Sequence, residues 1–270
     1  MSGRLITLKQ DLTYLHWSHI RSSSGTAGTF LKSESMLEGK KRYYKLSNYD
    51  PQLGVIGHEC INEYVVDRLL DVLGVEHLNY DLIHADIEIE GSITETYLCA
   101  SQDFKKRGES KVALDDFFRV NALPQESHYD FCVRNGWKDA VDAMIVIDYI
   151  ILNRDRHGAN IEVLRNPREK TLRLAPLFDH GLSFLCTCMN EEEIAQFDVL
   201  EDRKCQSFFG GLSAYENLAR IGGRKDVFSR KLKQEDRKYI FDGLDGVLSD
   251  IHMNKMWDMI YERYKTYEDL

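Results

Sequence analysis

The chain has 270 residues, 43% of them hydrophobic, and can bury the core of one two-lobed domain or two closely packed small ones. Its net charge of −9 argues against nucleic acid as the main partner, because phosphate binding needs a dense basic surface. The start lacks a long apolar stretch, and the longest apolar run, residues 143–152, is too short to span a bilayer. The six cysteines form no paired C-x-x-C array, which favours free thiols in a reducing compartment. We therefore expect a soluble cytoplasmic protein.

Residues 21–32 form a segment rich in serine and glycine. Small residues let backbone N–H groups approach a phosphate closely, and glycines tolerate the φ values that such a loop requires. The segment is no Walker A motif, since no Gly-Lys-Ser/Thr follows Gly28. A flexible linker is the alternative interpretation. Because a predicted strand comes next, we favour a phosphate-covering loop, made of Ser24, Gly25, Thr26, Ala27 and Gly28.

A strand and a helix are predicted after this segment. Residues 42–46 alternate in polarity as a strand does, and Lys45 lies near the strand's end. Residues 58–73 carry apolar side chains on one helical face, and Gly74 is placed to end that helix. Taken alone, a lysine in such a strand is more often a solvated charge at a sheet edge. For Glu63 the alternative interpretation is a surface carboxylate of the helix.

The second half of the chain places three polar side chains around a helix and a hairpin. Residues 137–152 have helical apolar spacing, so Asp155 is expected in the loop just past a buried helix. Two short strands, within residues 161–175, are predicted to form a hairpin that brings Asn160 and Asp179 side by side. Two amphipathic helices are expected near the C-terminus.

These three side chains are the groups that phosphoryl transfer needs. Asp155 would orient a hydroxyl and accept its proton, while Asn160 and Asp179 would hold Mg²⁺ on the phosphates of ATP. Taken alone, the loop at residues 153–160 is better explained as a surface cluster of ion pairs and turns. The second aspartate at hairpin distance favours a phosphotransfer site.

The motif Asp155-x-His157-x-x-Asn160, followed by residues 174–179, resembles the HipA-like serine/threonine kinase family, including its short single-module CtkA-type members. Phosphatidylinositol 3- and 4-kinases share a similar loop. Three consecutive glutamates at 191–193 would repel an anionic membrane, which favours a protein hydroxyl as the acceptor.

The resemblance implies roles for residues of the first half. Lys45 matches the family's ATP lysine, and Asn62-Glu63 matches an Asn-Glu pair near the start of the following helix, so that Glu63 would orient Lys45 toward the phosphates. His157 is assigned to the ATP site, where we expect it to fix the loop by hydrogen bonds. The strand at 97–104 would lead into the hinge that meets adenine. The remaining assigned residues are Ser101, Gln102 and Asp103 at this hinge, and Ser22, Ser23 and Ser24 as autophosphorylated serines.

The expected fold is α+β and kinase-like, with a sheet-plus-helix N-lobe at residues 1–103 and a mainly helical C-lobe at residues 104–270. ATP, Mg²⁺ and a protein with a Ser/Thr acceptor are the implied partners, together with an antitoxin-like or regulatory protein. Full-length HipA toxins carry an additional N-terminal subdomain, so their antitoxin arrangement is not carried over to this chain. His180 stands where conventional kinases have the Phe of Asp-Phe-Gly.

Two functions other than a protein kinase stay open at this point. A nucleotide-binding pseudokinase would act as a regulatory partner, although every acidic and amide group needed for transfer is present. An aminoglycoside-type phosphotransferase uses the same acid, amide and metal carboxylate, and an acidic surface would suit its cationic substrate.

Overall fold

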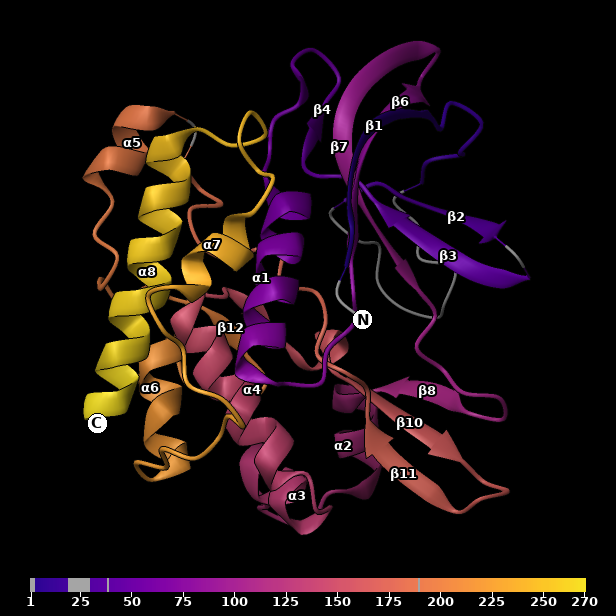
Figure 1. Ribbon diagram of the computed structural model, residues 1–270. Coiled ribbons are helices and arrows are strands. Elements are labelled where there is room, and N and C mark those ends of the chain that lie inside the picture. Colours follow the sequence, from indigo (N-terminus) through magenta and orange to yellow (C-terminus); the bar gives the residue numbers. More distant parts are fainter. Residues whose placement is uncertain (1–2, 19–29, 38, 189) are drawn as a thin grey trace.

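The computed structural model describes residues 3–18, 30–37, 39–188 and 190–270. A five-stranded sheet lies to one side and a mainly helical part to the other, with helix α1 (Glu59–Leu73) between them (Figure 1). The predicted α+β fold class is confirmed. In chain order, the last strand of this sheet is β7 (Ser92–Gln102), which ends next to the expected boundary between the two lobes. The division of the chain into lobes at residues 103 and 104 stays a prediction.

The five-stranded sheet places Lys45 in its interior. Its strand order is β1-β6-β7-β3-β2, with β1 parallel to β6 and the other pairs antiparallel. Lys45 ends β3 and pairs with Lys32 on one side and Cys99 on the other. The strand predicted around 42–46 is therefore confirmed. The strands are β1 (Leu5–Asp11), β2 (Lys32–Leu37), β3 (Lys40–Lys45), β6 (Asp81–Ile89) and β7 (Ser92–Gln102), with β4 (Tyr49–Asp50) and β5 (Gly54–Val55) in a separate pair.

Helix α1 joins the sheet to the helical part. Its apolar side chains are buried in one continuous core with those of the C-terminal helices, while a smaller core covers the sheet alone. Gly74 ends α1 with a φ of 71°, a left-handed conformation that glycine adopts without strain, as the sequence predicted. Helix α1 packs against β6 and β7 of the sheet on one side and against α7 (Asp236–Phe241) on the other.

The predicted hairpin and helices are present in the second half of the chain. The hairpin β10–β11 pairs with β8 in a three-stranded sheet. The remaining elements are β8 (Ser110–Ala113), α2 (Leu114–Asn121), α3 (His128–Arg134), α4 (Lys138–Ile150), β9 (Asp155–Arg156), η1 (Gly158–Asn160), β10 (Glu162–Asn166), β11 (Thr171–Leu174), α5 (Glu191–Gln196), β12 (Gln206–Ser207), α6 (Ala214–Leu218), η2 (Ala219–Ile221), α7 (Asp236–Phe241) and α8 (Asp250–Asp269).

The cysteines and the apolar character of the helices bear on the expectations from composition. All six cysteines are free thiols, as expected. Within the described ranges, none of the helices combines the length and the apolar character that crossing a bilayer requires.

Candidate active site

Lys45 is the centre of the candidate site. Its Nζ donates to Glu63 Oε1 at 2.9 Å and to Asp179 Oδ1 at 2.6 Å, joining β3, α1 and the segment after β11. Burial lowers the pKa of Lys45, but Asp179 and Glu63 outweigh it, so this pKa lies well above its ordinary value. Burial raises the pKa of Glu63 despite the nearby ammonium. Two carboxylates against one ammonium leave an excess of negative charge, which suits a metal ion.

Helix α1 also holds the segment that follows Asp179. Glu63 Oε2 accepts from the backbone N–H of His180 at 2.8 Å. Asn62 Nδ2 donates to the carbonyls of Gly181 and Ser183 at 2.9 and 3.1 Å. A Cβ at Gly181 would lie 3.2 Å from Lys45 Nζ, so a larger residue there would crowd the lysine. The Asn-Glu pair therefore fixes both the lysine and the backbone around Asp179.

Asp179 has an uncommon backbone conformation. Its φ of 61° lies in the left-handed region, which few residues other than glycine adopt and which tends to occur at functional sites. Its backbone N–H donates to Tyr80 Oη at 3.4 Å. The next side chain, His180, is 2% exposed; burial and Arg156 hold its pKa well below the ordinary value, so its ring is neutral. The structure gives no hydrogen-bond partner for His180 Nε2 among the residues it describes.

The predicted catalytic loop brings Asp155 and Asn160 into contact. Asn160 Nδ2 donates to the Asp155 carbonyl at 2.9 Å and to Asp155 Oδ2 at 3.2 Å. With its nitrogen turned to Asp155, the amide of Asn160 would use its oxygen as the metal ligand. His157 Nδ1 accepts from the Ala159 N–H at 3.2 Å, and this bond stiffens the loop as expected.

Arg156 was missed as a site residue by the sequence analysis. It is 2% exposed and bonds Asp148 of α4 with its Nε and Nη2, each at 3.0 Å from a carboxylate oxygen. Its Nη1 donates to the carbonyls of Asn160 and Phe178 at 3.3 and 2.8 Å. One guanidinium therefore joins the backbones of both predicted metal-binding segments. The only sequence signal was Asp148, a charge inside an apolar helix.

A cavity of about 540 Å³ opens beside Lys45, within the size range of small-molecule sites. Its lining includes Lys45, Asp179 and the three predicted hinge residues Ser101, Gln102 and Asp103. Asp155, Asn160 and His157 are not among the lining residues, so the assignment of His157 to ATP binding stays a prediction. The predicted phosphate loop, Ser24 to Gly28, and the predicted autophosphorylated serines, Ser22 to Ser24, lie outside the described residues.

Comparison with known proteins supports the fold. No family model and no curated protein matches the sequence. Among solved structures, the proinflammatory kinase CtkA of Helicobacter pylori is similar, with a TM-score of 0.68 and 16% identity over 97% of both chains. The toxin HipA of Shewanella oneidensis, solved with HipB and operator DNA, has a TM-score of 0.47 and 14% identity. The match covers 91% of this chain and 67% of the HipA chain. The chain therefore has the fold of a CtkA-type kinase, and the predicted resemblance is confirmed at the level of the fold.

Proposed function

We propose that this chain is an ATP- and Mg²⁺-dependent kinase that phosphorylates Ser or Thr hydroxyls of a protein substrate. The observation that carries this proposal is the Lys45 ammonium, bonded to both Glu63 and Asp179 at the wall of a nucleotide-sized cavity. In a kinase the lysine contacts the α- and β-phosphates, and a glutamate holds the lysine in that position. The fold, similar to that of CtkA, supports the same conclusion.

The donor set fits a magnesium ion. Asp179 offers a carboxylate and Asn160 an amide oxygen, and oxygen atoms are the ligands that Mg²⁺ prefers. When bound, the ion would neutralise charge on the β- and γ-phosphates. Arg156 keeps the two ligand-bearing segments together through their carbonyls.

The role proposed for Asp155 is to orient the acceptor hydroxyl and take its proton. Its side chain is 29% exposed, so an acceptor from solution can reach it, and the Asn160 amide fixes its direction. Ser101, Gln102 and Asp103 would contact the adenine ring from the end of β7. His157, by its bond to Ala159, would hold the loop in shape beside ATP.

Autophosphorylation of Ser22, Ser23 or Ser24 is proposed as the control of this activity. A phosphoserine carries about −1.5 to −2 charges at neutral pH, which ATP phosphates would repel from the same loop. Protein incubated with Mg-ATP should gain phosphate on one of these serines and then bind ATP more weakly. Peptide mapping checks this; a preparation that phosphorylates another protein but carries no phosphate at residues 22–24 would rule it out.

The acceptor class is tested with γ-labelled ATP, Mg²⁺ and the purified chain. A protein mixture, an aminoglycoside and phosphatidylinositol vesicles are supplied in separate reactions. The proposal predicts label on Ser or Thr of protein. Label on the aminoglycoside or the lipid alone would reject the protein-kinase assignment, and ATP binding without any transfer would indicate a pseudokinase.

A further inference from the structure

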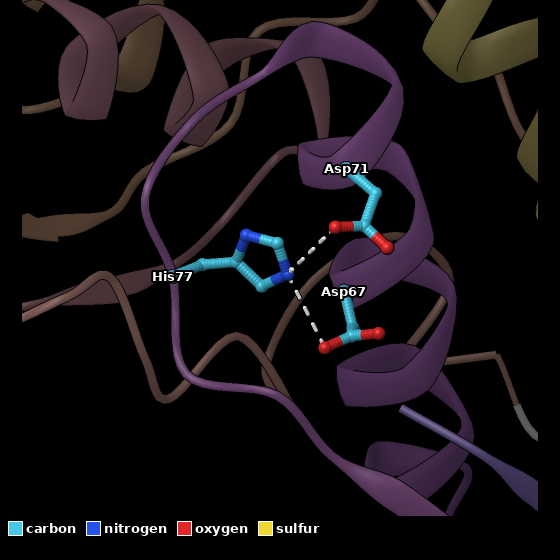
Figure 2. A group of neighbouring side chains, drawn as sticks. All are labelled: Asp67, Asp71 and His77. Carbon is cyan, nitrogen blue, oxygen red and sulfur yellow. Dashed lines mark ion pairs between the residues drawn. The ribbon is translucent and has the colours of Figure 1, made fainter. Parts of the chain in front are cut away.

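The side chains of Asp67, Asp71 and His77 converge (Figure 2), and none of the three is among the residues that line the cavity beside Lys45. The two aspartates lie four residues apart on one face of α1, and His77 comes from the segment after Gly74. The side chains of Asp67, Asp71 and His77 are 0%, 29% and 5% exposed. An imidazole and two carboxylates are a common set of metal ligands.

The distances within the cluster match a small divalent ion. His77 Nε2 lies 3.3 Å from Asp67 Oδ1 and 3.8 Å from Asp71 Oδ1, and the three ligand atoms all lie within 4.8 Å of one another. A tetrahedral Zn²⁺ with bonds of about 2.0–2.2 Å separates its ligand atoms by about 3.4 Å. The side chains therefore need little movement to bind such an ion.

The imidazole is oriented as a ligand. His77 Nδ1 lies 2.7 Å from the Val75 carbonyl, which requires a proton on Nδ1, and Nε2 faces the two carboxylates, where its lone pair binds an ion once the proton on Nε2 has left. Metal-binding histidines are usually held in this way by a backbone carbonyl. The Asn79 amide nitrogen lies 3.2 Å from Nε2 and 3.1 Å from Asp67 Oδ1; rotating this amide by half a turn would present its oxygen as a fourth ligand.

The carboxylates are held by further hydrogen bonds. Asp67 Oδ2 accepts from the Gly3 N–H at 3.0 Å, and its Oδ1 accepts from the Tyr80 N–H at 3.1 Å. Asp71 Oδ2 accepts from Tyr239 Oη at 3.1 Å. In both aspartates the Oδ1 atom faces His77, while Oδ2 contacts another part of the chain. Such a supporting shell is typical of a metal site.

We propose that Asp67, Asp71 and His77 bind a divalent ion of the Zn²⁺ class, separate from the magnesium of the active site. The imidazole nitrogen favours Zn²⁺ or a neighbouring transition metal over Mg²⁺ or Ca²⁺, which prefer oxygen ligands alone. Three protein ligands leave a position for water or for the Asn79 oxygen.

The ion would hold α1 against the segment around His77, which in turn contacts the backbone before Asp179. Glu63 lies one helical turn before Asp67, on the same face of α1. Beside His77, the Leu78 N–H donates to the Leu177 carbonyl at 2.8 Å, two residues before Asp179. The metal would therefore fix α1 near Glu63 relative to the backbone near Asp179. This consequence rests on the proposed function, whereas metal binding itself does not.

The test uses the full-length chain, stripped of metal with a chelator and titrated with Co²⁺. Co²⁺ with four ligands including nitrogen absorbs visible light strongly, whereas octahedral Co²⁺ in an oxygen site absorbs weakly. We expect one equivalent to give the strong spectrum and Zn²⁺ to abolish it. Asp71→Asn and His77→Gln should each weaken Co²⁺ binding at least about tenfold. Asp71→Asn keeps the shape of a half-exposed side chain and should fold.

Two matched variants act as controls. His84→Gln removes an imidazole that faces a single carboxylate, Glu95, at 2.8 Å, and should leave Co²⁺ binding unchanged. Asp179→Asn removes the expected magnesium ligand and should also leave the strong spectrum unchanged. Zn²⁺ should raise the melting temperature of the wild type and of His84→Gln, but not that of Asp71→Asn.

The competing occupant is a proton on His77. In the absence of an ion, Nε2 lies 3.3 Å from Asp67 Oδ1, a position from which a protonated Nε2 faces this carboxylate. An ion must displace this proton, so Co²⁺ affinity should increase with pH. Absence of the strong spectrum in the wild type, or equal Co²⁺ affinity in wild type, Asp71→Asn and His77→Gln, would overturn the proposed site.

Discussion

Replacing Lys45 by Met tests the electrostatics of the candidate active site. The methionine keeps the apolar volume of the stem but removes the ammonium from between Glu63 and Asp179. Glu63 is 0% exposed, so it would become a buried carboxylate that has lost its cation. Removing one partner of a buried pair costs about 3–5 kcal/mol of unfolding free energy, and we expect about 3 kcal/mol because Glu63 can take up a proton.

The pH dependence of this loss has a definite sign. The pKa of Glu63 is already raised in the folded protein, and removing Lys45 takes away a charge that lowers it. A carboxyl with a raised folded pKa binds its proton more tightly in the folded state, so stability increases as the pH falls through that pKa. The stability difference between wild type and Lys45→Met should therefore be largest at neutral pH and shrink on acidification.

Urea denaturation at neutral and mildly acidic pH measures both effects. Adding Glu63→Gln to Lys45→Met removes the buried charge and should restore part of the lost stability. The matched control is Lys41→Met in the same strand, whose partner Glu34 is 43% exposed and which should cost at most about 1 kcal/mol. If Lys45→Met were as stable as wild type, or the double variant no more stable than the single one, the buried charge of Glu63 would not depend on the Lys45 ammonium for its stability.

Two further substitutions test other parts of the site. Asp179→Ala should weaken ATP binding in the presence of Mg²⁺ by at least about tenfold, since the Asp179 carboxylate is the expected metal ligand. Titration calorimetry that gives the same Mg-ATP affinity for wild type and Asp179→Ala would reject this role. Arg156→Leu should reduce the unfolding free energy by about 3–5 kcal/mol, because it leaves the buried Asp148 carboxylate without its cation, with the Asn153 amide still donating to it. An unchanged urea midpoint would contradict the bidentate pair.

Local patterns predicted the elements of the site well. A strand shows alternating polar and apolar residues, and a helix shows apolar residues on one face. Both patterns are visible in the sequence, before Lys45 and along α1. The hairpin β10–β11 was visible from its turn residues. The order of these elements, together with the resemblance of the Asp155-x-His157-x-x-Asn160 motif to a kinase family, led to the kinase-like fold that the comparison supports.

Contacts between distant segments could not be predicted in the same way. The bond between Lys45 and Asp179 joins residues 134 positions apart, and it depends on how the sheet meets the helical part. Asp148 was visible as a charge in an apolar helix, but its partner Arg156 depends on the path of the loop after α4. His77 reaches the α1 aspartates only because the chain turns back after the helix.

Phosphotransfer by Asp155→Ala tests the catalytic role proposed for the loop at residues 155–160. We expect this variant to transfer phosphate from γ-labelled ATP at least about 100-fold more slowly than wild type, while its affinity for ATP stays the same. Asp116→Ala, which removes a 59% exposed carboxylate of α2, is the matched control and should keep the wild-type rate. Near-wild-type transfer by Asp155→Ala would contradict the assignment of this loop as the catalytic centre.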